Sequence, residues 1–194
     1  MGHMVGTPRT PRDRWVEEGL RALAAGGPDA VRVEALAKRL GVTKGGFYGY
    51  FADRGALLEA MLETWEREST DEVIDRVERE GGDPRTKIQR AGALTFSNDR
   101  LLPIDLAIRD WARRDEAVAE RLRRVDARRM ALLREMIGTF CADPDEVEAR
   151  SLMAFAMAIG GHFLDLDHGP RTKAEVRAHA ADILLARPRP KPKP

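Results

Sequence analysis

Cysteine, histidine and long apolar runs are all scarce in this 194-residue sequence. The single cysteine, Cys141, excludes an intrachain disulfide and is typical of a reducing compartment. No run of about 18 apolar residues exists, which excludes a membrane-spanning helix. The opening Met1-Gly2-His3-Met4 lacks a basic segment followed by an apolar one, so we interpret it as a cloning remnant and not as a secretory signal. We therefore expect a cytoplasmic protein with no membrane partner.

The chain also lacks a large excess of one charge. Its 33 lysines and arginines and 32 aspartates and glutamates give a formal net charge of +1. The charges are nevertheless unevenly placed along the chain. Residues 1–54 hold 9 basic and 6 acidic side chains (net +3), residues 55–186 hold 20 and 26 (net −6), and residues 187–194 add 4 basic ones. A basic N-terminal part on an acidic body is a weak indication of nucleic-acid binding.

Apolar residues recur at helical spacing along almost the whole chain, as Val16, Leu20 and Leu23 do near its start. Glycine, proline and capping residues interrupt this pattern, and no segment alternates as a β-strand does. We therefore predict an all-α protein. The predicted helices cover residues 12–25, a short segment ending at Gly41, residues 43–50, 53–80 and 84–100, a short segment around 104–111, and residues 115–140, 143–166 and 172–184.

The segment from Leu36 to Phe51 carries the most information about function. Ala37 supplies a small residue where two short helices cross, and Gly41 permits the tight turn between them. This spacing predicts a helix-turn-helix whose second helix enters the major groove of double-stranded DNA by its N-terminal end. A generic helix corner is the alternative interpretation. The residues expected to bury the inner faces are Leu36, Leu40, Val42 and Phe47.

Polar side chains and glycines surround the start of this second helix. Lys44 can reach a base edge or a phosphate, and Gly45 and Gly46 leave room for the backbone to approach the groove. The tyrosine hydroxyls that follow, and the arginine at the start of the next helix, are able to bind phosphates.

Residues 14–65 resemble the DNA-binding domain of the TetR family of transcriptional repressors. The resemblance implies base contacts near Lys44 and Gly45, and it implies phosphate contacts at Thr43, Tyr48, Tyr50 and Arg54. The matching residues are Gly26-Gly27, Leu36-Ala37, Gly41-Val42-Thr43-Lys44-Gly45, Phe47-Tyr48, Phe51 and Arg54-Gly55-Ala56-Leu57-Leu58.

Three residues depart from the usual pattern of that family. Arg32 stands where a Ser or Thr caps the helix before the turn, and we expect it to contact a phosphate instead. Gly46 replaces a common Thr, and Gly49 replaces a larger residue, which weakens the end of the recognition helix by roughly 1 kcal/mol relative to Ala. The predicted DNA-contacting set is Arg32, Thr43, Lys44, Gly45, Gly46, Tyr48, Tyr50 and Arg54.

The chain accordingly divides into four predicted segments. Residues 1–11 are expected to be a tag remnant and a disordered arm, and residues 187–194 a disordered, proline-rich basic tail. Residues 12–56, called the head, are the predicted DNA-binding domain. Residues 57–186, called the body, are the predicted ligand-binding and dimerisation domain.

The family resemblance implies that the last two long helices of the body pair with their copies in a homodimer. The residues support this independently, because residues 152–164 are apolar nearly all round and such a helix must be covered on several sides. A central core helix in a monomer is the alternative. The predicted dimer interface comprises Leu152, Ala154, Phe155, Ala158, Gly161, Phe163, Val176 and Ile183.

The resemblance also implies a small-molecule pocket in the body. Large apolar side chains with a few polar groups, Asp105 among them, favour a hydrophobic or aromatic ligand. Met61 and Trp65, on the helix that links head to body, are expected to couple this pocket to DNA binding. Each of these residues can also be explained as ordinary core. The predicted ligand-binding set is Met61, Trp65, Phe96, Asn98, Arg109, Trp111, Phe140, Met153, Met157 and His162.

No catalytic pattern is recognisable, so we expect neither an enzyme nor a cofactor nor a metal. His162, Asp165, Asp167 and His168 form a His/Asp cluster, but the sequence Asp167-His168-Gly169-Pro170 is better explained as a turn after a helix. The sequence therefore favours a homodimeric TetR-type repressor of a near-palindromic operator, released by a ligand. A helical ligand-binding or interaction protein that has lost specific DNA binding is the alternative, because the recognition helix is rich in glycine.

Overall fold

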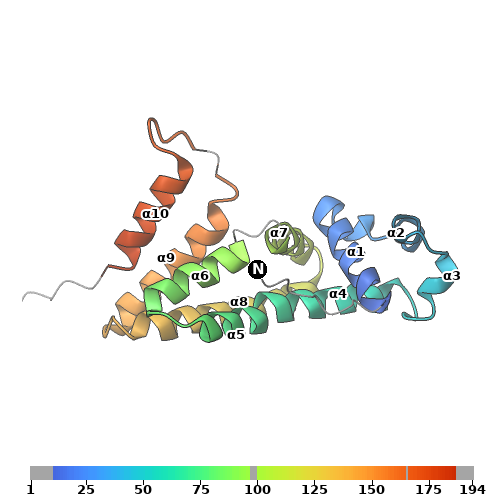
Figure 1. The fold of residues 1–194 in the computed structure, drawn as a ribbon, viewed down its shortest axis with the longest axis horizontal. Helices are drawn as coiled ribbons and strands as arrows, with labels where there is room; N and C mark the ends of the chain where they lie inside the picture. The colour runs from blue at the N-terminus through green and yellow to red at the C-terminus, as the bar shows by residue number, and fades with distance from the viewer. Residues whose placement is uncertain (1–10, 97–99, 165, 187–194) are drawn as a thin grey trace, which may run out of the picture. The chain divides into compact units, whose positions relative to one another are not determined.

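The computed structural model describes residues 11–96, 100–164 and 166–186. All regular structure in these residues is helical (Figure 1), as the all-α prediction requires. No helix within them is both long and apolar enough to cross a membrane. The elements are α1 (Pro11–Gly26), the 3-10 turn η1 (Pro28–Ala30), α2 (Val33–Leu40), α3 (Lys44–Phe47), α4 (Arg54–Ser69), α5 (Asp71–Glu80), α6 (Pro84–Phe96), α7 (Leu101–Ala112), α8 (Glu116–Gly138), α9 (Pro144–Gly160) and α10 (Lys173–Leu184).

These helices form two compact units. The first unit contains residues 11–69 and 100–122, and the second contains residues 70–96, 123–164 and 166–186. The predicted boundary between head and body, between residues 56 and 57, divides the chain by function and not by compactness. It stays a prediction. The predicted tail and residues 1–10 of the predicted arm lie outside the described residues.

The first unit is built around α1, which packs against α2, α4 and α7. The predicted stripe of Val16, Leu20 and Leu23 is buried, so the apolar face of α1 is confirmed. All three tryptophans of the chain lie in this core, at 3%, 0% and 9% exposure for Trp15, Trp65 and Trp111 respectively. Large aromatic side chains supply much of the apolar area that such a core removes from water.

An ionic cluster ties three helices of the first unit together. Arg100, directly before α7, binds Glu17 of α1 (Nη2 to Oε2, 2.6 Å) and Glu68 of α4 (Nη1 to Oε2, 2.5 Å). Hydrogen bonding to Glu17, more than any other contact, raises the pKa of Arg100. The side chain of Arg100 is only 31% exposed, so the contact is less screened than an ordinary surface pair.

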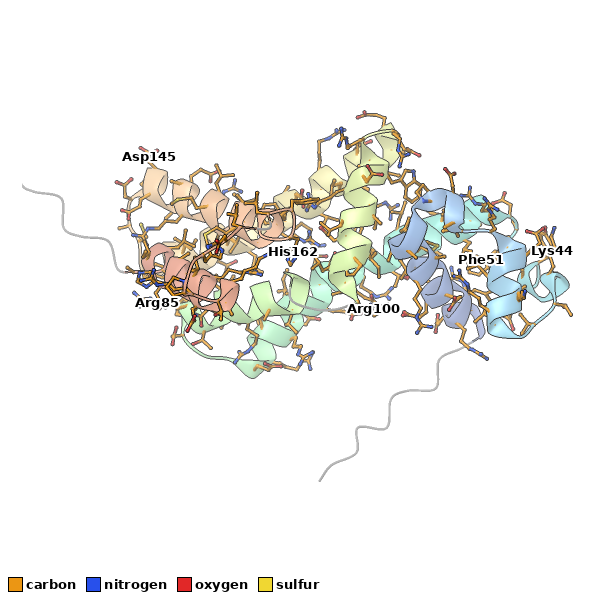
Figure 2. The ribbon with its side chains drawn as sticks, turned by 90° about the horizontal axis from the view of Figure 1, so that it is seen from above. Lys44, Phe51, Arg85, Arg100, Asp145 and His162 are labelled. Atoms are coloured by element: carbon orange, nitrogen blue, oxygen red, sulfur yellow. The ribbon has the colours of Figure 1, made fainter. Side chains whose placement is uncertain are left out.

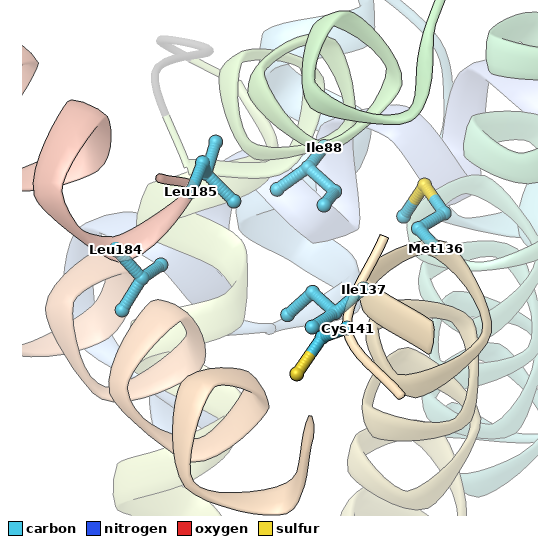
Figure 3. Close-up of a cluster of buried hydrophobic side chains, with 6 residues drawn as sticks. All are labelled: Ile88, Met136, Ile137, Cys141, Leu184 and Leu185. Carbon is cyan, nitrogen blue, oxygen red and sulfur yellow. The ribbon is translucent and has the colours of Figure 1, made fainter. Parts of the chain in front are cut away.

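The second unit has a smaller core, shown in Figure 3. Within this unit α5 packs against α6, and α9 packs against α6 and α10. The Arg85 guanidinium lies over the Phe140 ring, 5.7 Å from its centroid, and covers part of the apolar cluster. The buried residues of the cluster are Ile88, Met136, Ile137, Cys141, Leu184 and Leu185.

Capping residues set most helix starts as predicted. The Asp53, Asp83, Asp115 and Asp143 side chains each accept a backbone N–H from the first turn of the following helix. At α10 the Thr172 hydroxyl accepts the N–H of Glu175 (3.2 Å), while the Glu175 carboxylate accepts the N–H of Thr172 (2.7 Å). These reciprocal bonds form a capping box.

Several predicted helix boundaries were wrong, and the helix predicted over 43–50 ends already at Phe47. The helix predicted over 53–80 is divided at Thr70, because Ser69-Thr70-Asp71-Glu72 combines hydroxyl residues that compete for backbone bonds with acids that favour a new N-terminus. The helix predicted to reach Leu166 ends at Gly160, where two consecutive glycines weaken it. Pro103 lies inside the first turn of α7 and does not interrupt the helix. The backbone N–H that proline lacks would have no acceptor within the helix at this position.

Candidate nucleic-acid interface

The helix-turn-helix is formed by α2, α3 and the turn between them. Gly41 adopts a left-handed conformation (φ 69°), and the N–H groups of Gly41 and Val42 donate back to the carbonyls of Lys38 (3.3 Å) and Ala37 (3.0 Å). These bonds supply donors to carbonyls at the end of α2 that would otherwise have no hydrogen-bond partner. A side chain at position 41 would strain this conformation, so the turn depends on glycine.

Aromatic packing holds the recognition helix α3 against α1. Phe47 is fully buried, with its ring centroid 5.2 Å from that of Trp15 at an edge-on angle of 70°. Phe51 stacks on the other side of Phe47 at 5.3 Å, and the Arg12 guanidinium covers Phe51 at 5.1 Å. Figure 2 shows Phe51 within the head and Lys44 at its outer surface. A buried aromatic anchor therefore fixes a helix that is only four residues long.

The inner-face prediction was correct for Leu36 and Phe47 but wrong for Val42. Val42 is 45% exposed and lines an open cleft of about 340 Å³ together with Trp15 and Tyr50. Gly46 also borders this cleft. The turn residue Val42 therefore belongs to the exposed surface of the head and not to its core.

All eight predicted DNA-contacting residues are exposed and lie in the head. All eight are therefore open to solvent, although contact with DNA stays a prediction. Neither Arg32, before α2, nor Thr43, before α3, caps its helix with a side-chain bond. Thr43 therefore does not cap α3, although Thr is a common residue at this position. The exposed residues are Arg32, Thr43, Lys44, Gly45, Gly46, Tyr48, Tyr50 and Arg54.

All three basic residues of this surface have partners within the head, and Arg32 Nε donates to the carbonyl of Asp29 (3.2 Å). The Arg54 side chain donates from Nε to the carbonyl of Val31 (2.7 Å) and also binds the carbonyl of Pro28, so it braces η1 against α4. The Lys44 ammonium donates to the carboxylate of Glu34 on α2. This hydrogen bond lowers the pKa of Glu34 and raises the pKa of Lys44, so both groups are charged at neutral pH.

Glu34 is the residue of this site that sequence reasoning missed. It lies 10 residues before Lys44, a separation that no helical periodicity connects. An acid in the first turn of a helix is also explained by the helix dipole alone, which hides any second role.

Comparison with known proteins agrees with this geometry. Residues 16–61 match the sequence model of the bacterial regulatory proteins of the tetR family. A TetR-family transcriptional regulator from Rhodococcus sp. is 25% identical, with a TM-score of 0.63 over 90% of this chain and 98% of that one. The head is a TetR-family domain.

Other solved structures share the TetR-type fold at lower identity. A transcriptional regulator from Saccharomonospora viridis in complex with choline is 18% identical, with a TM-score of 0.70 over 90% of this chain and 94% of that one. AibR in complex with isovaleryl coenzyme A and operator DNA is 15% identical, with a TM-score of 0.61 over 90% and 97%. A comparison with curated protein sequences finds no match.

The predicted ligand-binding residues of the chain fall into two groups. In the first unit, the Trp65 indole N–H donates to Asp105 Oδ1 (3.2 Å), and Arg109 Nε donates to Asp105 Oδ2 (2.8 Å). Asp105 is buried, so these bonds stabilise its charge. Met61 and Trp111 are buried in the same unit. The second unit holds Phe140, Met153, Met157 and His162, while Asn98 and the side chain of Phe96 lie outside the described part of the chain.

The predicted dimer residues also divide. Leu152, Phe163 and Ile183 are 59%, 67% and 64% exposed. Ala154, in contrast, packs against the buried cluster of its own unit, and a side chain at Gly161 would meet Arg177 of α10. Small residues on α9 therefore serve contacts within the chain. Phe155, Ala158 and Val176 are half-buried, and the part that each of these residues plays in a dimer stays a prediction.

The His/Asp segment after α9 is a turn, as predicted. Asp167 accepts the N–H of Gly169 (2.8 Å), which has a left-handed φ of 61°. His162 lies in the turn that ends α9, whereas Asp165 is outside the described residues.

Proposed function

We propose that this chain is a homodimeric transcriptional repressor whose two heads bind successive major grooves of a near-palindromic operator. The observation that carries the proposal is the arrangement of α3 in the segment that matches the TetR family. Its apolar residue Phe47 is buried, whereas Lys44, Tyr48 and Tyr50 are exposed beside it. A cation at the N-terminal end of a recognition helix and hydroxyls just after its C-terminal end suit phosphate and base-edge contacts.

Selection of bound sequences from a random pool of duplex DNA tests this function directly. We expect enrichment of a two-fold symmetric site with half-sites separated by about one helical turn or a multiple of it. Lys44→Ala should lower the preference for that site, whereas Arg54→Ala should weaken binding to all sequences and flatten the dependence on salt. Because Arg54 also braces η1, its variant needs a thermal melt as a folding control. Equal binding by the wild type and both variants contradicts the proposal.

The proposed dimer interface is the exposed apolar surface of α9, α10 and the turn after α9. Leu152, Phe163 and Ile183 are each more than half exposed, and Met153 is 48% exposed. Large apolar side chains gathered on one surface are typical of a protein–protein interface.

Sedimentation of a charge-introducing variant tests the dimer. Leu152→Glu places a carboxylate in the centre of the proposed apolar contact, where it loses water without gaining a partner, so we expect a monomer. Glu135→Lys, an exposed charge change on α8, is the matched control and should leave the dimer intact. A wild-type monomer, or equal effects of the two variants, contradicts the proposed interface.

A small hydrophobic or aromatic ligand is proposed to release the operator. Two solved structures of this fold contain choline and isovaleryl coenzyme A, which supports a role for organic effectors in general. In this chain Trp65 of α4 bonds to Asp105 of α7, so a ligand that displaces α7 also displaces α4. Changing the ratio of binding to non-binding conformations from 1:99 to 99:1 takes about 5.5 kcal/mol of differential affinity.

A thermal-shift screen with aromatic acids, fatty acids and sterols tests this part of the proposal. A compound that raises the melting temperature should also lower operator affinity, because binding free energy and release are linked. If no compound of these classes stabilises the protein, the proposed ligand class is wrong.

One observation favours a second candidate, a ligand-binding or interaction protein without specific DNA binding. The recognition helix has a single turn, Lys44–Phe47, and contains two glycines. The sequence selection described above separates the two functions, since this candidate predicts no enriched site.

A further inference from the structure

Glu34 is an acid placed at the base-reading end of a surface that otherwise suits a polyanion. Its carboxylate is 65% exposed and binds the Lys44 ammonium, which is 51% exposed. Negative charge near the DNA backbone opposes association with any sequence. Any contribution of Glu34 to DNA binding must therefore lie in selectivity or in orientation, and not in affinity for DNA as such.

The backbone holds the two residues of this ion pair at a fixed separation. Glu34 lies on α2 and Lys44 is the first residue of α3, and the Gly41 turn joins the two helices. Leu36 of α2 and Phe47 of α3 are fully buried and anchor the two helices in the head. Only the two side chains can move relative to each other, so the position of the Lys44 ammonium depends on Glu34.

We propose that Glu34 is a specificity-determining residue that positions Lys44 for a base edge and withholds it from phosphates. The proposal rests on the DNA-binding function proposed above. An ammonium has three donors, so Lys44 can keep its bond to Glu34 while it donates to an acceptor such as guanine O6 or N7. To follow the phosphate backbone of an arbitrary sequence, in contrast, Lys44 has to leave Glu34.

The glycines of α3 make this arrangement important for discrimination. Gly45 and Gly46 follow Lys44 directly, and Gly49 follows the helix, so three positions around the recognition helix carry no side chain that could read a base. Lys44 consequently carries a large share of the direct readout. A lysine that was free to bind any phosphate would add affinity without adding sequence information.

Glu34→Gln tests the proposal, because it keeps the shape of the side chain and removes its charge. Affinity is measured for the selected operator and for an unrelated duplex over a range of salt concentrations. We expect binding to the unrelated duplex to strengthen by about two- to fivefold more than binding to the operator, the range typical of an exposed ion pair. The logarithm of the binding constant for the unrelated duplex should fall more steeply with the logarithm of the salt concentration, by up to about one released counterion.

Three further variants separate positioning from charge alone. Asp29→Asn removes the same charge from an exposed site of the head and should strengthen binding to both duplexes equally. Glu34→Asp keeps the charge on a shorter side chain and should still reduce the ratio of the two affinities. In a Lys44→Ala background, Glu34→Gln should no longer change that ratio, because the residue that it positions is absent.

The outcomes are distinguishable. If Glu34→Gln changes both affinities by the same factor, as Asp29→Asn does, Glu34 only repels DNA and the inference is wrong, while the regulator function stands. If the ratio changes equally in the Lys44→Ala background, Glu34 acts on another group and the inference is also wrong. A wild type that selects no sequence overturns both this inference and the proposed function.

Discussion

The two compact units differ in where they leave apolar side chains exposed. In the first unit the large exposed ones are Val42, Tyr48 and Tyr50, all beside the recognition helix. In the second unit they lie on α9, α10 and the intervening segment, and Leu152 and Phe163 are more than half exposed. The first unit therefore encloses its own core apart from its proposed DNA surface. The second leaves a broad apolar surface, which is the expected result for a unit completed by a partner.

The largest loss of stability is expected from a substitution at Phe47. It tests whether the first unit depends on its own enclosed core. Phe47→Ala removes a fully buried ring that contacts Trp15 and Phe51, which should lower the free energy of unfolding of the first unit by about 3–5 kcal/mol. Urea unfolding followed by circular dichroism measures the change. Tyr48→Ala, at the exposed neighbouring position, is the control and should cost well under half as much. Comparable losses in the two variants would show that the aromatic core does not anchor α3.

An intermediate effect is expected from the ionic cluster of the first unit. Arg100→Met leaves Glu17 and Glu68 close together without their shared cation, which should cost about 1–3 kcal/mol of unfolding free energy, less than for a fully buried pair. Adding Glu17→Gln to Arg100→Met should recover part of that loss in a double-mutant cycle. Arg76→Met, which breaks an exposed pair with Glu80 in the second unit, should cost less than about 0.5 kcal/mol. If Arg76→Met lowers the free energy of unfolding more than Arg100→Met does, the ion pair of the second unit contributes more to stability than the ionic cluster of the first.

The smallest effect is expected from the capping box of α10, and it should depend on pH. Because the Glu175 carboxylate accepts hydrogen bonds from Thr172, its pKa is lowered from the ordinary value of 4.5. A lowered folded-state pKa stabilises the protein above the unfolded-state value, and that contribution is lost as the pH falls through the folded-state value.

Thermal melting of wild type and Glu175→Gln checks this dependence. The wild type should be the more stable at pH 7, and the difference should shrink as the pH falls below 4.5. Thr172→Val removes the hydroxyl and keeps the branched shape, so the same substitution at Glu175 should have a smaller effect in that background. A difference that is constant over this pH range would exclude a role for the carboxylate charge.

Local patterns were sufficient to predict most of the fold. Asp83, Asp115 and Asp143 begin helices because each carries an acceptor where the backbone has unsatisfied donors, and that chemistry is visible in the sequence. The break at Thr70 was missed because the apolar periodicity continues through it to Val73 and Val77. Periodicity reports which face is buried, and it is insensitive to a single residue that leaves the helical conformation.

The exposure of the candidate DNA-contacting residues agrees with the sequence analysis, but their contacts within the head were not predicted. The exposed set around α3 follows from the helix-turn-helix spacing and the family resemblance. The bonds of Arg54 to the carbonyls of Pro28 and Val31, and of Lys44 to Glu34, join residues from different elements. Such pairs depend on how helices pack, which no local spacing specifies. The exposure of Val42 likewise depends on how α2, α3 and the turn between them pack.

The burial of Trp15, Trp65 and Trp111 in one unit has a practical consequence. Indole emission shifts when a buried ring meets water, so intrinsic fluorescence of this protein reports on the first unit, where all three indoles lie. The amide signal of the helices arises from both units. Comparing the denaturation curve from indole fluorescence with the curve from the amide circular dichroism of the wild type will show whether the units unfold in one transition or in two.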